Sequence, residues 1–180
     1  MKRYRYLIER HEEVLNNLDA QVNENFDRRD QSALARREWQ LAAKRFREYR
    51  SEVDELVDRC IAQGIEDDSE LRRFAFSFVE CDPYYFRSGY TLSRLLRKIK
   101  WLSLFETEKT MLQNLILKRI DTKAFRNFRD ICRLIPIIET VGFHSAIASR
   151  ARSSNPDVKH RAELAASYFP LTGNFVATDL

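Results

Sequence analysis

The chain contains little glycine, proline or cysteine. Its 180 residues include four glycines, four prolines and three cysteines. So few Gly and Pro disfavour a turn-rich all-β fold, and a hydrophobic fraction of 44% excludes a disordered chain, so we expect an all-α protein. The cysteines, Cys60, Cys81 and Cys132, are an odd number and widely spaced, which indicates neither a disulfide framework nor a zinc site. We expect them to be reduced core residues of a cytoplasmic protein.

Long hydrophobic runs are also missing. No stretch approaches about 18 consecutive apolar residues, the length that a membrane-spanning helix requires. The basic start, MKRYRY, is not followed by an apolar run long enough for an export signal. We therefore expect a soluble protein that has no membrane partner.

The sequence has no motif that identifies a catalysed reaction. It lacks H-E-x-x-H, G-x-x-x-x-G-K-[ST], G-x-G-x-x-G and G-x-S-x-G, the signatures of zincins, phosphate loops, dinucleotide sites and hydrolase elbows. His11 lies on an apolar helical seam, where we expect it to be packed, and His144 and Ser145 point in different directions on a helix. The acids of residues 65–70 precede a helix, which favours capping over metal binding. We expect no enzyme and no catalytic, metal-binding or cofactor-binding residues; the alternative is an enzyme whose groups converge from distant positions.

Charge divides the chain into two parts. Residues 1–83 carry 15 Lys and Arg against 19 Asp and Glu, a net charge of −4, whereas residues 84–161 carry 16 against 6, a net charge of +10. A basic region of this kind can attract nucleic acid, an anionic membrane or an acidic protein. The alternative is that these cations only solvate the outer faces of helices.

The first third of the sequence predicts two long helices. Apolar residues at alternating spacings of three and four predict a helix over residues 2–25, and the pattern resumes over residues 39–60 and ends at Gly64, a helix C-cap. Matching seams and a short polar connection predict an antiparallel, coiled-coil-like hairpin over residues 1–64. The seams could close within one chain, pair in a dimer, or accept a helix of another protein. Their members are Tyr4, Ile8, His11, Leu15, Leu18 and Val22 in the first helix, and Trp39, Ala42, Phe46, Tyr49, Val53, Leu56 and Cys60 in the second.

Residues 69–169 predict shorter helices. We expect Asp82-Pro83 to end one of them and Thr91 to cap the next. Helical hairpins begin near Leu71, Glu106 and Ile137, a repeat of roughly 30 to 35 residues that suits stacked hairpins. This rhythm resembles HEAT-like and tetratricopeptide-like arrays in spacing alone, and a compact irregular bundle is the alternative. Residues 170–180 have no helical period and are expected to form a C-terminal tail.

In the stretch from Tyr84 to Trp101, cations and aromatic rings alternate without any acid. Cations suit phosphates and flat rings suit unpaired bases, so the stretch could bind nucleic acid. Further cations form a second basic ridge over residues 126–133 and a third over residues 150–161, and the three could merge into one surface. The competing interpretation is that Tyr84, Phe86 and Tyr90 fold inward as a wedge between two helices. The candidates for contact with an anionic partner are Arg87, Tyr90, Arg94, Arg97, Lys98, Trp101, Arg126, Arg129 and Arg133.

Two functional hypotheses follow from these patterns. The first is a non-catalytic helical interaction protein, a scaffold or adaptor subunit that docks protein partners. The second is a nucleic-acid-binding subunit that uses the basic face of residues 84–161 on phosphates. We favour the first, because the sequence contains no known nucleic-acid-binding module. Self-association through the N-terminal helices is compatible with either hypothesis.

Overall fold

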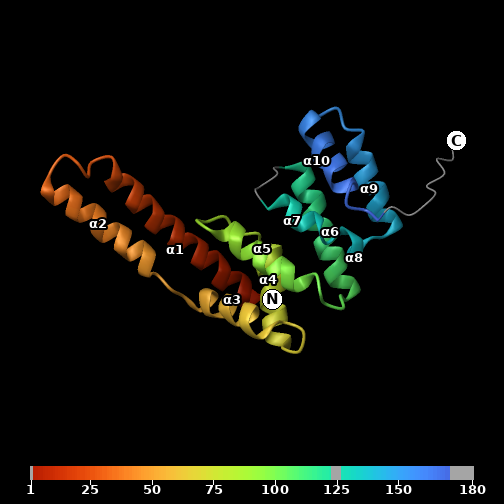
Figure 1. Cartoon of the computed structure of the whole chain (residues 1–180), viewed down its shortest axis with the longest axis horizontal. Coiled ribbons are helices and arrows are strands. Elements are labelled where there is room, and N and C mark those ends of the chain that lie inside the picture. Colours follow the sequence, from red (N-terminus) through yellow and green to blue (C-terminus); the bar gives the residue numbers. More distant parts are fainter. Residues whose placement is uncertain (1, 123–126, 171–180) are drawn as a thin grey trace. The chain divides into compact units, whose positions relative to one another are not determined.

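The computed structural model describes residues 2–122 and 127–170, and this part of the chain is built of helices and connecting loops without strands (Figure 1). The expectation of an all-α protein with a long N-terminal hairpin and shorter helices after it is confirmed. The chain divides into two compact units, residues 1–102 and residues 103–180. The predicted segment 69–169 therefore contributes to both units. None of the helices in the described ranges is long and apolar enough to cross a membrane.

The first unit begins with the predicted hairpin, in which α1 (Lys2–Phe26) packs antiparallel to α2 (Ala33–Glu48). Ser32 caps α2, because its Oγ accepts a hydrogen bond from the N–H of the third residue of the helix at 3.1 Å. Only the N-terminal half of α1 has fully buried residues, since the rest of the unit lies against that half. The outer part of the hairpin, residues 12–48, is a two-helix arm whose apolar seam is only partly covered.

The second predicted helix is interrupted, so the expectation of one continuous helix up to Gly64 was wrong. Helix α2 stops short, and α3 (Glu52–Gln63) starts after Ser51. Ser51 and Asp54 form a capping box: the Ser51 Oγ accepts from the Val53 N–H at 3.1 Å, and the Asp54 carboxylate accepts from the Ser51 N–H at 2.8 Å. These caps start a new helix although the apolar period continues through the break. Gly64, at a φ of 87°, ends α3 as expected.

Two further helices complete the first unit, α4 (Ser69–Cys81) and α5 (Ser88–Ile99). Asp68 caps α4, its carboxylate accepting from two N–H groups of the first turn at 2.9 and 3.0 Å, so the expected capping role is confirmed for this one acid of residues 65–70. Helix α4 ends before Pro83, as predicted.

Helix α4 lies at the centre of the first unit, because it contacts α1, α3 and α5. Its rings Phe74 and Phe78 are fully buried, with their centroids 6.1 Å apart. The Tyr4 ring of α1 meets Phe74 edge-on at 5.7 Å, and the Tyr4 hydroxyl donates to Glu70 at 3.0 Å. The aromatic core of α4 therefore anchors the N-terminal part of α1.

The second unit has α6 as its central helix, with Leu112, Ile116 and Ile120 fully buried. The predicted hairpin start at Glu106 is confirmed, whereas the start near Ile137 falls inside a short helix. Thr140 caps the next helix, α9, because its Oγ1 accepts a hydrogen bond from the Phe143 N–H at 3.2 Å. The helices described in this unit are α6 (Glu106–Asp121), α7 (Phe128–Cys132), α8 (Ile135–Ile138), α9 (Val141–Ala151) and α10 (Pro156–Ala166).

Candidate interaction surface on helix α5

Helix α5 has one buried side and one open side. Its buried side consists of Leu92, Leu95, Leu96 and Ile99, none of which is more than 3% exposed. Successive members are three, one and three residues apart, so they lie on one face of the helix. This face packs on α3 and α4. The other side of α5 therefore points away from the core of the first unit.

The open side of α5 carries two aromatic rings and two arginines. Tyr90, Arg94, Arg97 and Trp101 are separated by four, three and four residues, so they lie along one side of the helix. The turn continues past the last helical residue, because the Trp101 N–H still bonds the Lys98 carbonyl at 3.2 Å. Tyr90 is 71% exposed and Trp101 is 80% exposed. We call these four residues the α5 stripe.

The arginines of the α5 stripe are not neutralised by any acid in the part of the chain that the structure describes. Arg94 and Arg97 are both exposed, and neither forms an ion pair with another described residue. Lys98 is half-buried beside them, and the Lys100 ammonium lies 5.9 Å from the centroid of the Trp101 ring. Exposed cations that form no ion pair give this side of α5 a positive potential.

The loop before α5 contradicts the wedge interpretation. Tyr84, Phe86 and Tyr90 do not fold inward, because they are 70%, 53% and 71% exposed. Tyr85 turns inward instead, with its ring edge-on to the His11 ring at a centroid distance of 4.9 Å, and burial raises the pKa of its hydroxyl. The sequence carries no signal for this choice, since a loop lacks the period that tells inward from outward positions.

Arg87 lies at the start of α5 in a left-handed conformation, with a φ of 72°. The prediction that Thr91 caps α5 is therefore wrong, because the helix already begins one residue after Arg87. The guanidinium of Arg87 lies 5.1 Å from the centroid of the Phe86 ring. Glu80, an acid close in sequence, pairs with Arg5 at 3.3 Å. Arg87 and Phe86 form a cation–ring pair at the N-terminal end of α5, and Phe86 is a surface residue that the sequence analysis missed.

The second predicted ridge belongs to the second unit and is only partly open. Arg133 forms an ion pair with Asp130 one turn earlier. Arg129 is exposed and has no ion pair with a described residue, while Arg126 lies outside the described residues. Of the described arginines of this ridge, Arg129 thus resembles those of the α5 stripe, because it is exposed and forms no ion pair with a described residue.

The third ridge is used largely inside the second unit. Arg150 holds Asp121 with two hydrogen bonds of 2.8 Å, a bidentate pair that joins α9 to the end of α6. The Nε of Arg161 donates to the backbone carbonyl of Ile120 at 2.7 Å, which satisfies one of the last carbonyls of α6. These two arginines therefore have a structural role in packing α9 and α10 on α6.

His11 is packed, as expected, and is 2% exposed. Its Nδ1 lies 2.8 Å from the Ser51 Oγ, which lies 3.3 Å from the Asp54 carboxylate. This order does not activate a nucleophile, because the serine stands between the imidazole and the acid and already caps α3. Burial lowers the pKa of His11, and the negative charge of Asp54 opposes part of that effect. The cluster is a structural joint between α1 and α3.

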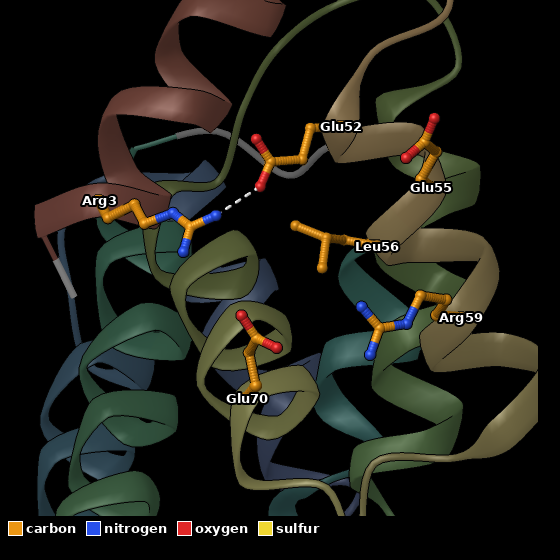
Figure 2. A pocket seen from close by; sticks show the side chains of 6 residues that line it. All are labelled: Arg3, Glu52, Glu55, Leu56, Arg59 and Glu70. Carbon is orange, nitrogen blue, oxygen red and sulfur yellow. Dashed lines mark hydrogen bonds and ion pairs between the residues drawn. The ribbon is translucent and has the colours of Figure 1, made fainter.

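A hollow in the first unit lies between the start of α1, α3 and α4 (Figure 2). Figure 2 shows Arg3 reaching toward Glu52, and the two side chains are joined at 2.8 Å. Glu70 accepts the hydrogen bond of the Tyr4 hydroxyl. Because these charged groups serve as contacts between helices, we assign no ligand to the hollow. Its lining residues are Arg3, Glu52, Glu55, Leu56, Arg59 and Glu70.

The cysteines do not form a reactive site. Cys60 and Cys132 are fully buried core residues, as expected, whereas Cys81 is partly exposed. Burial raises the pKa of Cys60 and of Cys132 to about 12 and that of Cys81 to about 11, so the thiolate form is scarce at neutral pH. Within residues 2–122 and 127–170, no three His, Cys, Asp or Glu side chains gather where they could hold a metal ion.

Comparison of the chain with protein-family models, with curated proteins and with solved structures finds no match. No residue role is therefore transferred from a relative. The chemistry of the α5 stripe itself is the basis for a functional assignment.

Proposed function

We propose that this chain is a non-catalytic helical interaction protein, a scaffold or adaptor subunit that docks a partner protein on the α5 stripe. The observation that supports the proposal is the placement of Arg94 and Arg97 between the exposed rings of Tyr90 and Trp101. Trp, Tyr and Arg are the residue types that most often dominate the binding energy of protein interfaces.

The α5 stripe favours an acidic partner with an apolar anchor. Covering the Trp101 ring removes a large apolar surface from water, which contributes about 2 kcal/mol. Arg94 and Arg97 can donate charge-assisted hydrogen bonds to carboxylates beside that ring. The partner surface that fits best therefore has Asp or Glu side chains around an aliphatic or aromatic centre.

Two other features are in keeping with an adaptor in the cytoplasm. Cys60 and Cys132 are buried and unbridged, which suits a reducing compartment. Arg150 and Arg161 are engaged in helix packing, so fewer cations are left for a long phosphate-binding surface. The engagement of Arg150 and Arg161 favours a protein partner over nucleic acid.

A nucleic-acid-binding subunit is the second candidate function. Trp101, with the Lys100 ammonium beside it, offers a ring on which an unpaired base could stack. Phosphates would then contact Arg94 and Arg97, and the affinity would fall steeply as salt is raised.

Affinity capture with charge-matched variants tests the protein-docking function. The full chain is immobilised and exposed to a nuclease-treated lysate of the cells that produce it. Arg94→Glu with Arg97→Glu reverses the charge of the stripe, and Lys118→Glu with Arg152→Glu makes the same change at exposed positions of the second unit. We expect a stoichiometric partner protein that the wild type and the second variant retain and the first variant loses. Recovery of no protein with this pattern contradicts the proposal.

A labelled single-stranded oligonucleotide tests the second candidate with the same variants. Binding at low salt that weakens steeply at moderate salt, and that disappears with Arg94→Glu and Arg97→Glu, would support nucleic-acid binding. No binding at low salt would exclude it.

A further inference from the structure

The arm formed by residues 12–48 has an apolar side that the helices of the first unit leave open. Leu34 is 67% exposed and Leu41 is 49% exposed, although α2 packs on α1. The two leucines are seven residues apart, so they lie on the same side of α2. On α1, Val14 and Leu18 are only half-buried. We call these four residues the leucine side of the arm.

The loop before α5 covers the opposite side of the arm at its inner end. Asn16 donates to the Tyr84 carbonyl at 3.0 Å, and the Glu12 carboxylate accepts from the Tyr84 N–H at 3.0 Å. The Phe46 ring of α2 lies 5.5 Å from the Phe86 ring. The loop therefore occupies one flank of the hairpin and touches both of its helices.

Helix geometry places the leucine side on the other flank. At about 100° per residue, Val14 and Leu18 point roughly 160° away from the two α1 residues that hold the loop. On α2, Leu41 points roughly 160° away from Ala43, which is buried. Leu34 and Leu41, with the half-buried Val14 and Leu18, thus lie on the flank that the loop does not cover, whereas Phe26, which is 45% exposed, packs on Trp39 with their ring centroids 6.3 Å apart.

The two helices of the arm carry opposite charge. From Glu12 to Phe26, α1 has acids and no base, whereas α2 has five bases and two acids. No ion pair joins α1 to α2 among the residues that the structure describes. These opposite charges are therefore not used to hold the hairpin together. Glu12 accepts from the Tyr84 N–H on the flank that the loop covers, and Asp19 is half-buried and accepts from Asn23, whereas Glu13, Glu24 and the bases of α2 are exposed. The acids are Glu12, Glu13, Asp19 and Glu24, and the bases are Arg36, Arg37, Lys44, Arg45 and Arg47.

We propose that the arm pairs with the arm of a second copy of this chain. A two-fold axis parallel to the helices brings the two leucine sides together and places α1 of each copy on α2 of the other. The acidic helix then meets the basic helix at both contacts. A two-fold axis across the helices would place α1 on α1 and α2 on α2, with like charges facing each other. The charge pattern therefore selects the first arrangement, a four-helix bundle.

The length of the arm limits the area that this pairing can bury. Helix α2 has 16 residues and is therefore about 24 Å long. The face of one arm is two helices across, each about 10 Å wide. Pairing two such faces buries on the order of 1,000 Å² of accessible surface, summed over both copies, which is the lower end for a specific interface. The dimer is therefore expected to form in the micromolar range and to depend on concentration.

Sedimentation equilibrium of the full chain tests the pairing. The expected mass rises from the 21.4 kDa of one chain to twice that value across the micromolar range. Leu34→Asp with Leu41→Asp, both at exposed positions, is expected to weaken the dimer at least tenfold without loss of helix content. A wild-type chain that stays monomeric at every concentration overturns the proposal.

Charge exchange separates pairing from folding. Glu13→Lys, Asp19→Lys and Glu24→Lys make both helices of the arm basic, and Arg37→Glu, Lys44→Glu and Arg45→Glu give both helices an acidic excess. Each variant alone is expected to dimerise at least tenfold more weakly, and an equal mixture is expected to form the heterodimer. Circular dichroism verifies that both variants are folded. Two folded variants that remain monomeric when mixed contradict the proposal and leave the function of the α5 stripe unaffected.

Discussion

The Ser51 Oγ lies 2.8 Å from the Nδ1 of His11 and joins the start of α3 to the buried part of α1. The same hydroxyl accepts from the Val53 N–H, so one serine serves both a helix cap and a tertiary contact. The Nε2 of His11 is buried and has no hydrogen-bond partner among the described residues. A proton added at His11 would therefore place a buried charge, only partly offset by Asp54 at 3.9 Å, in the joint between the arm and the rest of the first unit.

The first unit is expected to lose stability as the pH falls below about 6.5. Burial lowers the pKa of His11 in the folded chain, so the unfolded chain binds the proton more readily in the window between the two pKa values. Stability is complete above the unfolded pKa and declines below it, by at most about 1.4 kcal/mol per pH unit. Urea unfolding midpoints above and below this pH measure the effect. His11→Gln should remove most of the difference, and a variant with the full wild-type pH dependence would contradict this account.

Ser51→Ala should destabilise the first unit more than Ser32→Ala. Ser32 only caps the exposed helix α2, so its loss is expected to cost about 1 kcal/mol. Ser51 caps α3 and also satisfies His11, so its loss is expected to cost about 2 kcal/mol. Denaturant unfolding of the two variants gives both values. Equal losses would mean that the bond to His11 contributes nothing.

Tyr85→Ala and Tyr90→Ala should differ sharply. Tyr85 is packed against His11, and removal of its ring is expected to cost about 3 kcal/mol. Tyr90 is 71% exposed, and removal of its ring is expected to change the stability by less than about 0.5 kcal/mol. Thermal and denaturant unfolding measure both. The opposite order would restore the interpretation of Tyr90 as an inward wedge.

Arg150→Ala should weaken the second unit without affecting partner capture. Its bidentate bonds to Asp121 are partly solvent-screened, because the two side chains are 28% and 45% exposed, so the expected loss is about 1 kcal/mol. Arg129→Ala, at an exposed position, should leave the stability unchanged. Loss of partner capture with a folded Arg150→Ala chain would move the docking surface into the second unit.

The helices and their buried sides could be predicted from the sequence, because apolar spacing and capping residues are local signals. The limits of α1, the end of α4 before Pro83 and the buried side of α5 follow from such signals. The break before α3 could not be predicted from the apolar period, which runs on through Tyr49 and Val53. It depends on the capping box of Ser51 and a bond to His11, forty residues away in sequence.

The candidate surface could be predicted only in part. The spacing of Arg94, Arg97 and Trp101 was enough to place them on the open side of one helix, whereas Tyr90 was expected in the loop before Thr91 and joins this side only because α5 begins at Ser88. Which cations are engaged elsewhere depends on contacts between distant residues, such as Arg150 with Asp121. Net charge alone therefore overstates the extent of the basic surface.

The affinity of the captured partner for Trp101→Ala tests the role of the α5 stripe most directly. Val141→Ala is the matched control, because Val141 is an apolar residue that is 88% exposed and lies in the second unit. Titration calorimetry with the purified partner is expected to show about 30-fold weaker binding for Trp101→Ala, equivalent to about 2 kcal/mol, and wild-type binding for Val141→Ala. Wild-type affinity for a folded Trp101→Ala chain would contradict the assignment of the α5 stripe as the docking surface.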